Sequence, residues 1–253
     1  MSATAANSNS RYPLFTAIVL ALLAAALNIA LWWGGNYPHG PDDWHGKISG
    51  FAVSFFQRYQ SPFKQSYPND EEITADLKLL HRYTDNIRTY TMQQNPQVFR
   101  LAQQQGLKVM AGAEIDKRLE NNEREIELLI AKARAYPDTI TRVIVGNEVL
   151  FRNDLTPEQM MAYLDRVRAA VRQPVSIAEP DYIWLKYPEL AQHVDYITIH
   201  LFPFWNGVVR HNAVDAAYGA YGSIVQRFPG KHVVVGEIGW PSNGDRHEYA
   251  DPS

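Results

Sequence analysis

Two glutamates stand at the ends of short apolar runs, Glu148 after Val143–Asn147 and Glu237 after Val233–Gly236. If both runs are strands of one parallel sheet, the two carboxyl groups meet at the same edge of that sheet. Two carboxyl groups about 5–5.5 Å apart can carry out a double displacement at the anomeric carbon of a sugar. One group, kept protonated, donates to the leaving oxygen, and the other, ionised, attacks. Their proximity also separates their pKa values, as the two roles require.

Other polar side chains come at the ends of the neighbouring apolar runs. They are Gln57, Arg88, Tyr90, Glu114, Asp116, Asn147, Glu179 and His200. We expect Glu114 and Glu179 to be acids at the rim of a cleft or salt-bridged structural acids rather than substrate contacts. His200 fits a hydrogen-bond partner near the nucleophile and, nearly as well, a structural histidine in the wall of the sheet.

Seven short apolar runs predict strands. Most are continuously apolar rather than alternating, which is typical of strands buried on both faces. The predicted strands are Gly50–Phe56, Asn86–Tyr90, Lys108–Ala113, Thr141–Val145, Pro174–Ala178, Val194–His200 and His232–Gly236.

Amphipathic segments between these runs predict helices. The stretch Thr156–Gln159 offers an N-cap threonine, a proline at the first helical position and a glutamine at the third. Glu123, Glu125 and Glu127 indicate a solvated helix face. The predicted helices are Asn69–Tyr83, Asn95–Gln105, Asn121–Tyr136, Thr156–Arg172, the shorter Pro188–His193, and Asn212–Phe228.

The alternation of strand and helix predicts an α/β fold of parallel strands with right-handed crossovers. An open doubly wound sheet and a closed barrel both fit. Because no GxGxxG motif or P-loop follows the first strand, we favour a (β/α)8 TIM barrel. About sixteen residues follow Glu237, too few for an eighth unit. We therefore expect a barrel that lacks its eighth β/α unit and is open between strands seven and one, either because the chain is a fragment or because something else seals the gap.

The N-terminal region predicts a membrane anchor. The uncharged run Leu14–Trp33 is long enough to cross about 30 Å of hydrocarbon, and its final tryptophans suit an interface. We favour one uncleaved transmembrane helix over a cleaved signal peptide or a buried helix. Because Arg11 precedes the run, we expect the N-terminus in the cytoplasm and the rest outside. The expected parts are a cytoplasmic tail (1–11), the anchor (12–33), a linker (34–47) and the barrel (48–253).

Composition excludes several function classes. The net charge of −3 gives no electrostatic reason to expect a nucleic-acid partner. The chain has no cysteine, which excludes disulfides, thiolate catalysis and cysteine-based zinc sites. His39, His45, Asp42 and Asp43 lie in the linker with a spacing that matches no ligand motif, so we read that segment as a tether. We expect no metal and no cofactor.

Four segments resemble the motifs of one enzyme family. The stretch Lys231–Gly244 resembles the nucleophile signature of family 17 glycoside hydrolases, the β-1,3-glucanase family within a large clan of (β/α)8 retaining glycosidases. Val145–Glu148 resembles the family's acid/base strand, and Ile87–Tyr90 its second-strand motif. His200–Trp205 resembles its aromatic sixth-strand motif, although Phe202 stands where tyrosine is usual. These matches span most of the predicted barrel.

The resemblance implies roles for individual residues. Glu148 would be the acid/base, Glu237 the nucleophile, and Asn147 a hydrogen-bond partner of the sugar 2-hydroxyl. The other expected substrate-binding residues are Tyr90, His200, Phe204, Trp205 and Trp240. Trp205 and Trp240 could be core residues, but we favour sugar platforms, because an aromatic face matches the apolar face of glucose.

The resemblance also implies a setting and leaves two functions open. Bacterial members similar to this chain include membrane-bound glucan transglycosylases and domains attached to glucan synthases. We therefore expect a β-glucan substrate and a single-pass protein of a bacterial inner membrane, associated with or fused to such a synthase. The first function is a retaining β-1,3-glucan hydrolase or transglycosylase. The alternative is a non-catalytic glucan-binding or scaffolding domain, or a fragment, of a membrane β-glucan synthase.

Overall fold

The structure is a computed structural model that describes residues 12–36 and 44–252. The chain divides into an N-terminal unit that ends at His45 and a larger unit that begins at Gly46. The expected tail and residues 37–43 of the linker, which include His39, Asp42 and Asp43, lie outside the described residues.

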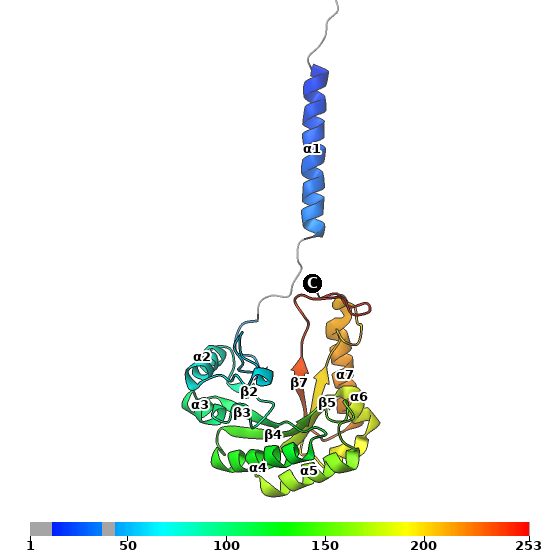
Figure 1. The fold of residues 1–253 in the computed structure, drawn as a ribbon. Coiled ribbons are helices and arrows are strands. Elements are labelled where there is room, and N and C mark those ends of the chain that lie inside the picture. Colours follow the sequence, from blue (N-terminus) through cyan, green and yellow to red (C-terminus); the bar gives the residue numbers. More distant parts are fainter. Residues whose placement is uncertain (1–11, 37–43, 253) are drawn as a thin grey trace, which may run out of the picture. The chain divides into compact units, whose positions relative to one another are not determined.

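The N-terminal unit contains one continuous helix, α1, over Tyr12–Gly35 (Figure 1). It is long and apolar enough to cross a membrane, and from Leu14 onward its side chains are exposed rather than packed in a core. The helix covers the expected anchor at 12–33. Among the described residues it is the one helix with these properties.

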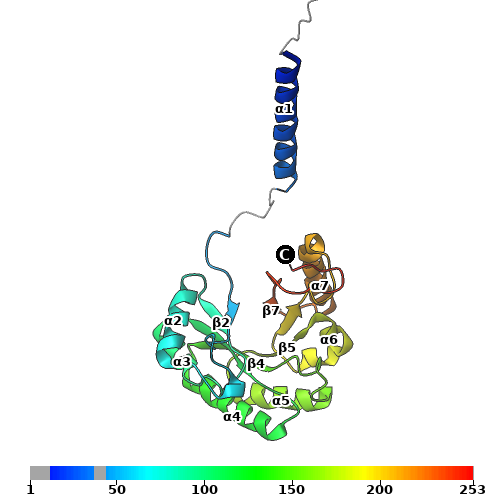
Figure 2. The same cartoon turned by 45° about the horizontal axis from the view of Figure 1, so that its top comes forward.

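The larger unit is built on seven parallel strands that follow one another around the sheet in chain order. The helices lie on the outer side of this curved sheet (Figure 2). The strands are β1 Phe51–Ala52, β2 Asn86–Arg88, β3 Lys108–Ala113, β4 Ile140–Asn147, β5 Val175–Pro180, β6 Ile197–Leu201 and β7 Val233–Ile238. The arrangement is a nearly closed (β/α) barrel of the TIM type, as the sequence predicts.

Six α-helices and three short 3-10 helices connect the described strands. The α-helices are α2 Asp70–His81, α3 Val98–Gln104, α4 Leu119–Ala135, α5 Pro157–Ala170, α6 Asp181–Lys186 and α7 Ala213–Arg227. The 3-10 helices are η1 Pro62–Lys64, η2 Pro188–Gln192 and η3 Arg210–Asn212.

Both faces of the central strands are buried, which explains their continuously apolar sequences. Val143, Ile177 and Ile197 are fully shielded from solvent. They belong to one large hydrophobic core between the strands and the surrounding helices. The polar side chains of a candidate site are therefore sought at the strand ends, where a barrel carries its site.

The two edges of the sheet differ from its centre. Strand β7 pairs with β6 and strand β1 with β2, and in the described part of the chain no ladder joins β7 to β1. The first strand is expected over Gly50–Phe56, but the ladder covers only Phe51–Ala52. A strand with one hydrogen-bonded neighbour has fewer contacts to hold it extended.

Helix boundaries follow the capping residues. Thr156 caps α5 with Gln159 in a reciprocal capping box, and Asn69 caps α2 in the same way. By contrast, α3 begins at Val98 rather than near Asn95, and Gln97 at its start makes no side-chain cap. The residues before it form a single turn, in which the backbone N–H of Val98 donates to the carbonyl of Asn95 at 3.1 Å. The helix predicted at Pro188–His193 is the short η2, and the sequence reading missed α6, which has only six residues.

Candidate active site

Glu148 stands on a distorted turn at the end of β4. The register between β4 and β5 shifts between Ile144 and Asn147, which marks a bulge. Gly146 has φ +84°, and a Cβ there would lie 2.6 Å from Cγ2 of Val149. Glu148 itself has φ +56°, a left-handed conformation that costs a non-glycine residue about 1–3 kcal/mol. The turn is held because the backbone N–H of Glu148 donates to the carbonyl of Ala178 at 2.8 Å.

Glu237 lies inside β7 rather than after it, since this strand extends to Ile238. A register shift between β6 and β7 places His200 opposite Glu237. Gly236 makes this possible, because a Cβ at that position would lie 2.6 Å from Cγ2 of Thr198 and 3.0 Å from Nη1 of Arg88. The missing side chain lets Arg88 approach the strand.

The two glutamates meet at the same end of the sheet. One carboxylate oxygen of Glu148, one of Glu237 and a ring nitrogen of His200 all lie within 4.8 Å of one another. Both glutamate side chains are mostly covered, with exposed fractions of 19% and 23%. The structure therefore brings together the pair that the sequence singles out, at a spacing that suits a double displacement.

His200 is fully buried and contacts both parts of the site. Its Nδ1 lies 2.8 Å from Oε1 of Glu148, and its Nε2 lies 3.1 Å from Nη1 of Arg88. An arginine only donates hydrogen bonds, so Nε2 is the acceptor and Nδ1 carries the proton that it donates to Glu148. This hydrogen bond is the main reason why the pKa of Glu148 is lowered, against the raising effect of burial. The sequence analysis expects one of the two carboxyl groups to be kept protonated, and on Glu148 this hydrogen bond acts in the opposite direction to burial.

Arg88, from β2, organises the other half of the site. Its Nη1 donates to Oε1 of Glu237 and to the carbonyl of Gly236, both at 3.1 Å. Its Nη2 donates to Oδ1 of Asn147. Only 5% of Arg88 is exposed, so one buried guanidinium fixes Asn147 and Glu237 together. The sequence analysis placed Arg88 in the second predicted strand but gave it no role, although a charged residue inside a predicted strand is a usable signal.

Glu148, His200 and Glu237 are also the residues that could hold a metal ion, by the closeness of their ligand atoms. Arg88, however, donates to Nε2 of His200 and to Oε1 of Glu237. A guanidinium therefore already supplies the positive charge at two of these ligand atoms.

Tyr90 lies beside this group, half-buried. The Arg88 guanidinium stands over its ring at 4.9 Å. Burial, and next the negative charge of Glu237, raise the pKa of the Tyr90 hydroxyl well above its usual range. Tyr90 is therefore a neutral hydroxyl next to the carboxylate.

The aromatic residues expected at the glucose subsites form a cluster of their own. The ring of Phe204 meets Trp205 at 5.1 Å and Trp240 at 5.4 Å, both edge to face. Trp205 is 63% exposed and Trp240 half-buried, so both can present a face to a ligand. Phe204 is buried and cannot, which corrects its expected role: it supports the two tryptophans.

Two further acids differ from their expected roles. Glu179 is fully buried and accepts hydrogen bonds from the backbone N–H groups of Leu150 (2.8 Å) and Phe151 (3.3 Å). Glu179 is therefore a structural acid, which is one of the two expected roles, but its partners are backbone N–H groups rather than a basic side chain. Burial raises its pKa to about 7, and this carboxyl holds the turn that follows Glu148.

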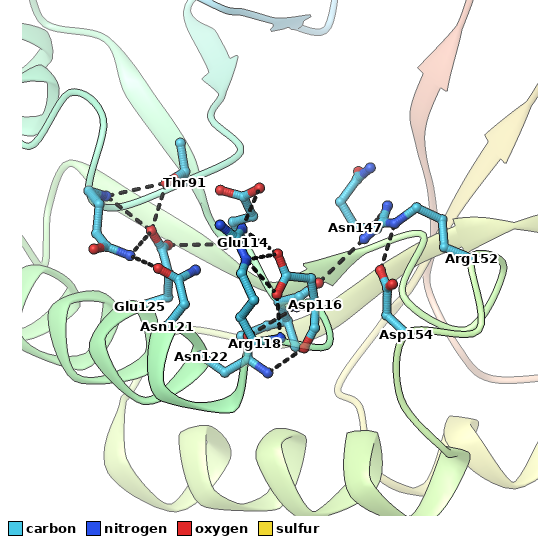
Figure 3. A network of polar contacts seen from close by, with 12 residues as sticks. Thr91, Glu114, Asp116, Arg118, Asn121, Asn122, Glu125, Asn147, Arg152 and Asp154 are labelled. Carbon is cyan, nitrogen blue, oxygen red and sulfur yellow. Dashed lines mark hydrogen bonds and ion pairs between the residues drawn. The ribbon is translucent and has the colours of Figure 1, made fainter. Parts of the chain in front are cut away.

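Glu125 is not on a solvated face as the sequence reading expects but is fully buried. It accepts hydrogen bonds from the Thr91 hydroxyl at 2.7 Å, from the backbone of Met92 at 2.8 Å and from the backbone of Glu114 at 3.0 Å (Figure 3). It thus ties the loop after β2 to the end of β3. Glu114 itself is half-buried and lies 3.7 Å from Arg118, as expected for an acid at a rim.

Comparison with known proteins gives a consistent picture. Residues 50–253 match the family model described as "BtgE/BtgC glycoside hydrolase domain". The chain is 25% identical to "Glucan endo-1,3-beta-glucosidase btgC" of Emericella nidulans over 194 residues, 70% of this chain and 30% of that protein. The chain thus spans less than a third of that relative.

A solved structure resembles the fold closely. The glycoside hydrolase family 17 β-1,3-glucanosyltransferase of Rhizomucor miehei superposes with a TM-score of 0.71 at 27% identity, covering 81% of this chain and 76% of that chain. An active-site mutant of the same enzyme, in complex with laminaritriose, superposes with a TM-score of 0.71 at 26% identity, covering 80% of this chain and 75% of that chain.

Proposed function

This chain belongs to the BtgE/BtgC glycoside hydrolase domain family, within glycoside hydrolase family 17, and from this premise we propose that it cleaves or transfers β-1,3-glucosidic bonds by double displacement. Glu237 is the nucleophile and Glu148 the acid/base. The observation that carries the proposal is that one carboxylate oxygen of each glutamate lies within 4.8 Å of the other.

The reaction runs in two steps. Glu237 attacks the anomeric carbon while Glu148 gives its proton to the leaving glycosidic oxygen, which departs as a sugar hydroxyl. Glu148, now ionised, takes a proton from water or from a sugar hydroxyl, whose oxygen displaces Glu237 and restores the β linkage or a free β-anomer. Water gives hydrolysis and a sugar hydroxyl gives transfer.

The contacts of Arg88 support these roles. Because Nη1 of Arg88 donates to Oε1 of Glu237, the carboxylate is held in one orientation and its Oε2 is left to attack. Because Nη2 donates to Oδ1 of Asn147, the amide Nδ2 group is left to donate to a ligand oxygen. A hydrogen bond from Asn147 to the sugar 2-hydroxyl strengthens in the transition state of such reactions.

The substrate class follows from the relatives. The Rhizomucor miehei enzyme is named a β-1,3-glucanosyltransferase, and its mutant was solved with laminaritriose. The Emericella nidulans relative is named for glucan endo-1,3-β-glucosidase activity. We carry the β-1,3-glucan substrate over to this chain as part of the proposal.

The test is incubation of the full chain, in detergent, with laminari-oligosaccharides, beside a Glu237→Ala variant. Products shorter than the substrate indicate hydrolysis, and products both shorter and longer indicate transfer. The variant should show no turnover but bind laminaritriose with a Kd near that of the wild type in calorimetry. Full activity in Glu237→Ala would show that Glu237 is not the nucleophile.

We also propose on which side of a membrane the barrel lies. Helix α1 anchors the chain in a membrane, with the N-terminus in the cytoplasm and the barrel outside. Its length and its exposed apolar side chains support this. Extraction of the protein by alkaline carbonate, or protection of the barrel from protease in spheroplasts, would contradict it. Association with a glucan synthase stays a prediction from the sequence.

A further inference from the structure

We infer that Arg152 is a positioning residue for the proposed acid/base: it fixes the peptide group between Asn147 and Glu148, and so directs the carboxyl group of Glu148. The inference rests on the proposed function, because it concerns the proton that Glu148 gives to the leaving oxygen. Arg152 lies on the turn that follows β4, and its side chain is 41% exposed. A partly exposed side chain can be replaced without leaving a buried charge unpaired in its place.

The peptide group between Asn147 and Glu148 is held from both sides. Its N–H, which belongs to Glu148, donates to the carbonyl of Ala178 in β5 at 2.8 Å. Its carbonyl, which belongs to Asn147, accepts a hydrogen bond from Nη1 of Arg152 at 2.6 Å. Rotation of a planar peptide group changes ψ of the residue before it and φ of the residue after it. The two hydrogen bonds therefore set the direction in which the Glu148 side chain leaves the backbone.

Glu148 needs this support because its backbone conformation is unfavourable. Its φ of +56° lies in the left-handed region. A residue other than glycine keeps such a conformation only when its surroundings impose it. If one of the two hydrogen bonds is lost, the turn can relax toward an ordinary φ, and the carboxyl group moves with the backbone.

The guanidinium of Arg152 is itself oriented by several bonds. Its Nη2 donates to the carbonyl of Ile115, in the loop after β3, at 3.4 Å. Its Nε donates to Asp154 at 2.7 Å, and Figure 3 shows Arg152 next to both Asn147 and Asp154. The five donors of a guanidinium lie in one rigid plane, so these bonds fix its position. The backbone N–H of Arg152 also donates to the carbonyl of Glu148 at 3.0 Å, which closes the turn.

A small movement of the Glu148 carboxyl matters for proton transfer. A general acid must come within hydrogen-bond distance of the leaving oxygen. A displacement of about 1 Å can lower a rate about 100-fold. Because Glu237 lies on a different strand, β7, loss of Arg152 should weaken the proton transfer and leave the nucleophile in place.

The charge of Arg152 offers a second route to Glu148, and the two routes differ in their effect. The largest cause that lowers the pKa of Glu148 is the hydrogen bond from His200, and the positive charge of Arg152 adds a smaller effect in the same direction. Loss of this charge alone raises the pKa, so the alkaline limb of the kcat/KM profile moves to higher pH and the maximum does not fall. Loss of position lowers the maximum.

The experiment compares two aryl β-glucosides on the full chain in detergent. A dinitrophenyl glucoside releases an acidic phenol that needs little protonation, whereas a phenyl glucoside needs more. We expect Arg152→Met, which keeps a straight side chain without donors or charge, to lower the maximal kcat/KM for the phenyl glucoside about 10- to 100-fold. The dinitrophenyl glucoside should change by less than about 3-fold. Arg152→Lys keeps a charged donor and should recover most of the phenyl glucoside rate.

Arg168→Met is the matched control. Arg168, on α5, pairs with Asp195 at 2.9 Å and donates to the carbonyl of Gln192 at 3.4 Å, so it makes the same kinds of contact as Arg152. Its loss should leave both rates unchanged. Equal losses on the two glucosides in Arg152→Met overturn the inference, because they indicate a general structural role. A moved alkaline limb with an unchanged maximum overturns it as well, because it indicates a role of charge alone.

A crystal structure of Arg152→Met separates a failure of the inference from a failure of the proposed function. We expect φ of Glu148 to leave the left-handed region, or Oε1 of Glu148 to move beyond hydrogen-bond distance of Nδ1 of His200. Either change supports the positioning role of Arg152 even if the wild type cleaves neither glucoside. An unchanged peptide group with an unchanged Glu148–His200 hydrogen bond refutes that role, whether or not the wild type is active.

Discussion

The carboxylate of Glu148 and the imidazole of His200 share a hydrogen bond of 2.8 Å. The other imidazole nitrogen lies 3.5 Å from Oε1 of Glu237. One buried ring, oriented by Arg88, thus spans the space between the two glutamates. Both carboxylates therefore lie next to the same buried ring.

In the proposed mechanism, the hydrogen bond from His200 to Glu148 affects the pH range of the reaction. A general acid works only while protonated, so kcat/KM falls as pH rises through the pKa of Glu148. Because His200 lowers that pKa, His200→Leu should raise it and move the alkaline limb of the pH profile to higher pH. The measurement is kcat/KM against pH for a laminari-oligosaccharide. If the alkaline limb of the profile stays in place or moves to lower pH, the His200 hydrogen bond does not lower the pKa of the general acid.

Glu148→Gln should separate substrates by their leaving groups. An aryl glucoside with an acidic phenol needs little help from a proton donor, so its kcat/KM should change by less than about 10-fold. A laminari-oligosaccharide, which leaves as an alcohol, should lose about 10²- to 10⁴-fold. Steady-state rates on both substrates give the comparison. Equal losses would argue against the acid role.

Gly236→Ala should disturb the site through packing alone. Its Cβ would lie 2.6 Å from Thr198 and 3.0 Å from Arg88, so the free energy of unfolding should fall by about 1–3 kcal/mol and activity should fall with it. Gly239→Ala is the matched control, because nothing lies within 4 Å of a Cβ there. Urea unfolding and activity are measured on both. If the two variants behave alike, the close approach of Arg88 to β7 is not as described.

The sequence predicts the strands that deliver Glu148 and Glu237, because long apolar runs reveal strands buried on both faces. It cannot predict the bulges at Gly146 and Gly236, since a register shift depends on the neighbouring strand. The hydrogen bonds of Arg88 are equally hidden, because its partners come from strands far apart in the chain.

The prediction that Glu125 lies on a solvated helix face is wrong, and the sequence itself could have prevented this error. The glutamates at 123, 125 and 127 alternate, and alternation has no meaning on a helix. Glu125 shares the helical spacing of the buried residues Asn122, Ile126 and Leu129, which places it on the inward face of α4. The prediction that Phe204 contacts the sugar is wrong for a different reason. A phenylalanine can serve as a sugar platform or as a core residue, and only its packing in the folded chain shows which.

Glu179 should make stability depend on pH. Its pKa is about 7 in the folded protein and 4.5 as the ordinary value. Between these values the folded state keeps a proton that the unfolded state has lost, so stability falls as pH rises through this window, by on the order of 3 kcal/mol. The Glu179→Gln variant has no ionisable carboxyl group at this position, so its stability lacks this pH dependence. The free energy of unfolding of Glu179→Gln, less that of the wild type, should therefore increase from pH 4.5 to pH 8. A difference that stays constant with pH would contradict the conclusion that burial raises the pKa of Glu179.

In the proposed reaction, Glu237 forms a covalent bond with the sugar while Glu148 first donates and then accepts a proton. The most direct measurement is to trap this intermediate with a 2-deoxy-2-fluoro β-laminaribioside that carries an activated leaving group, and to map the modified peptide by mass spectrometry. We expect one added fluorodisaccharide on Glu237, and none in Glu237→Ala. A label on another residue, or release of the leaving group with the α-anomer as first product and no label, would contradict it.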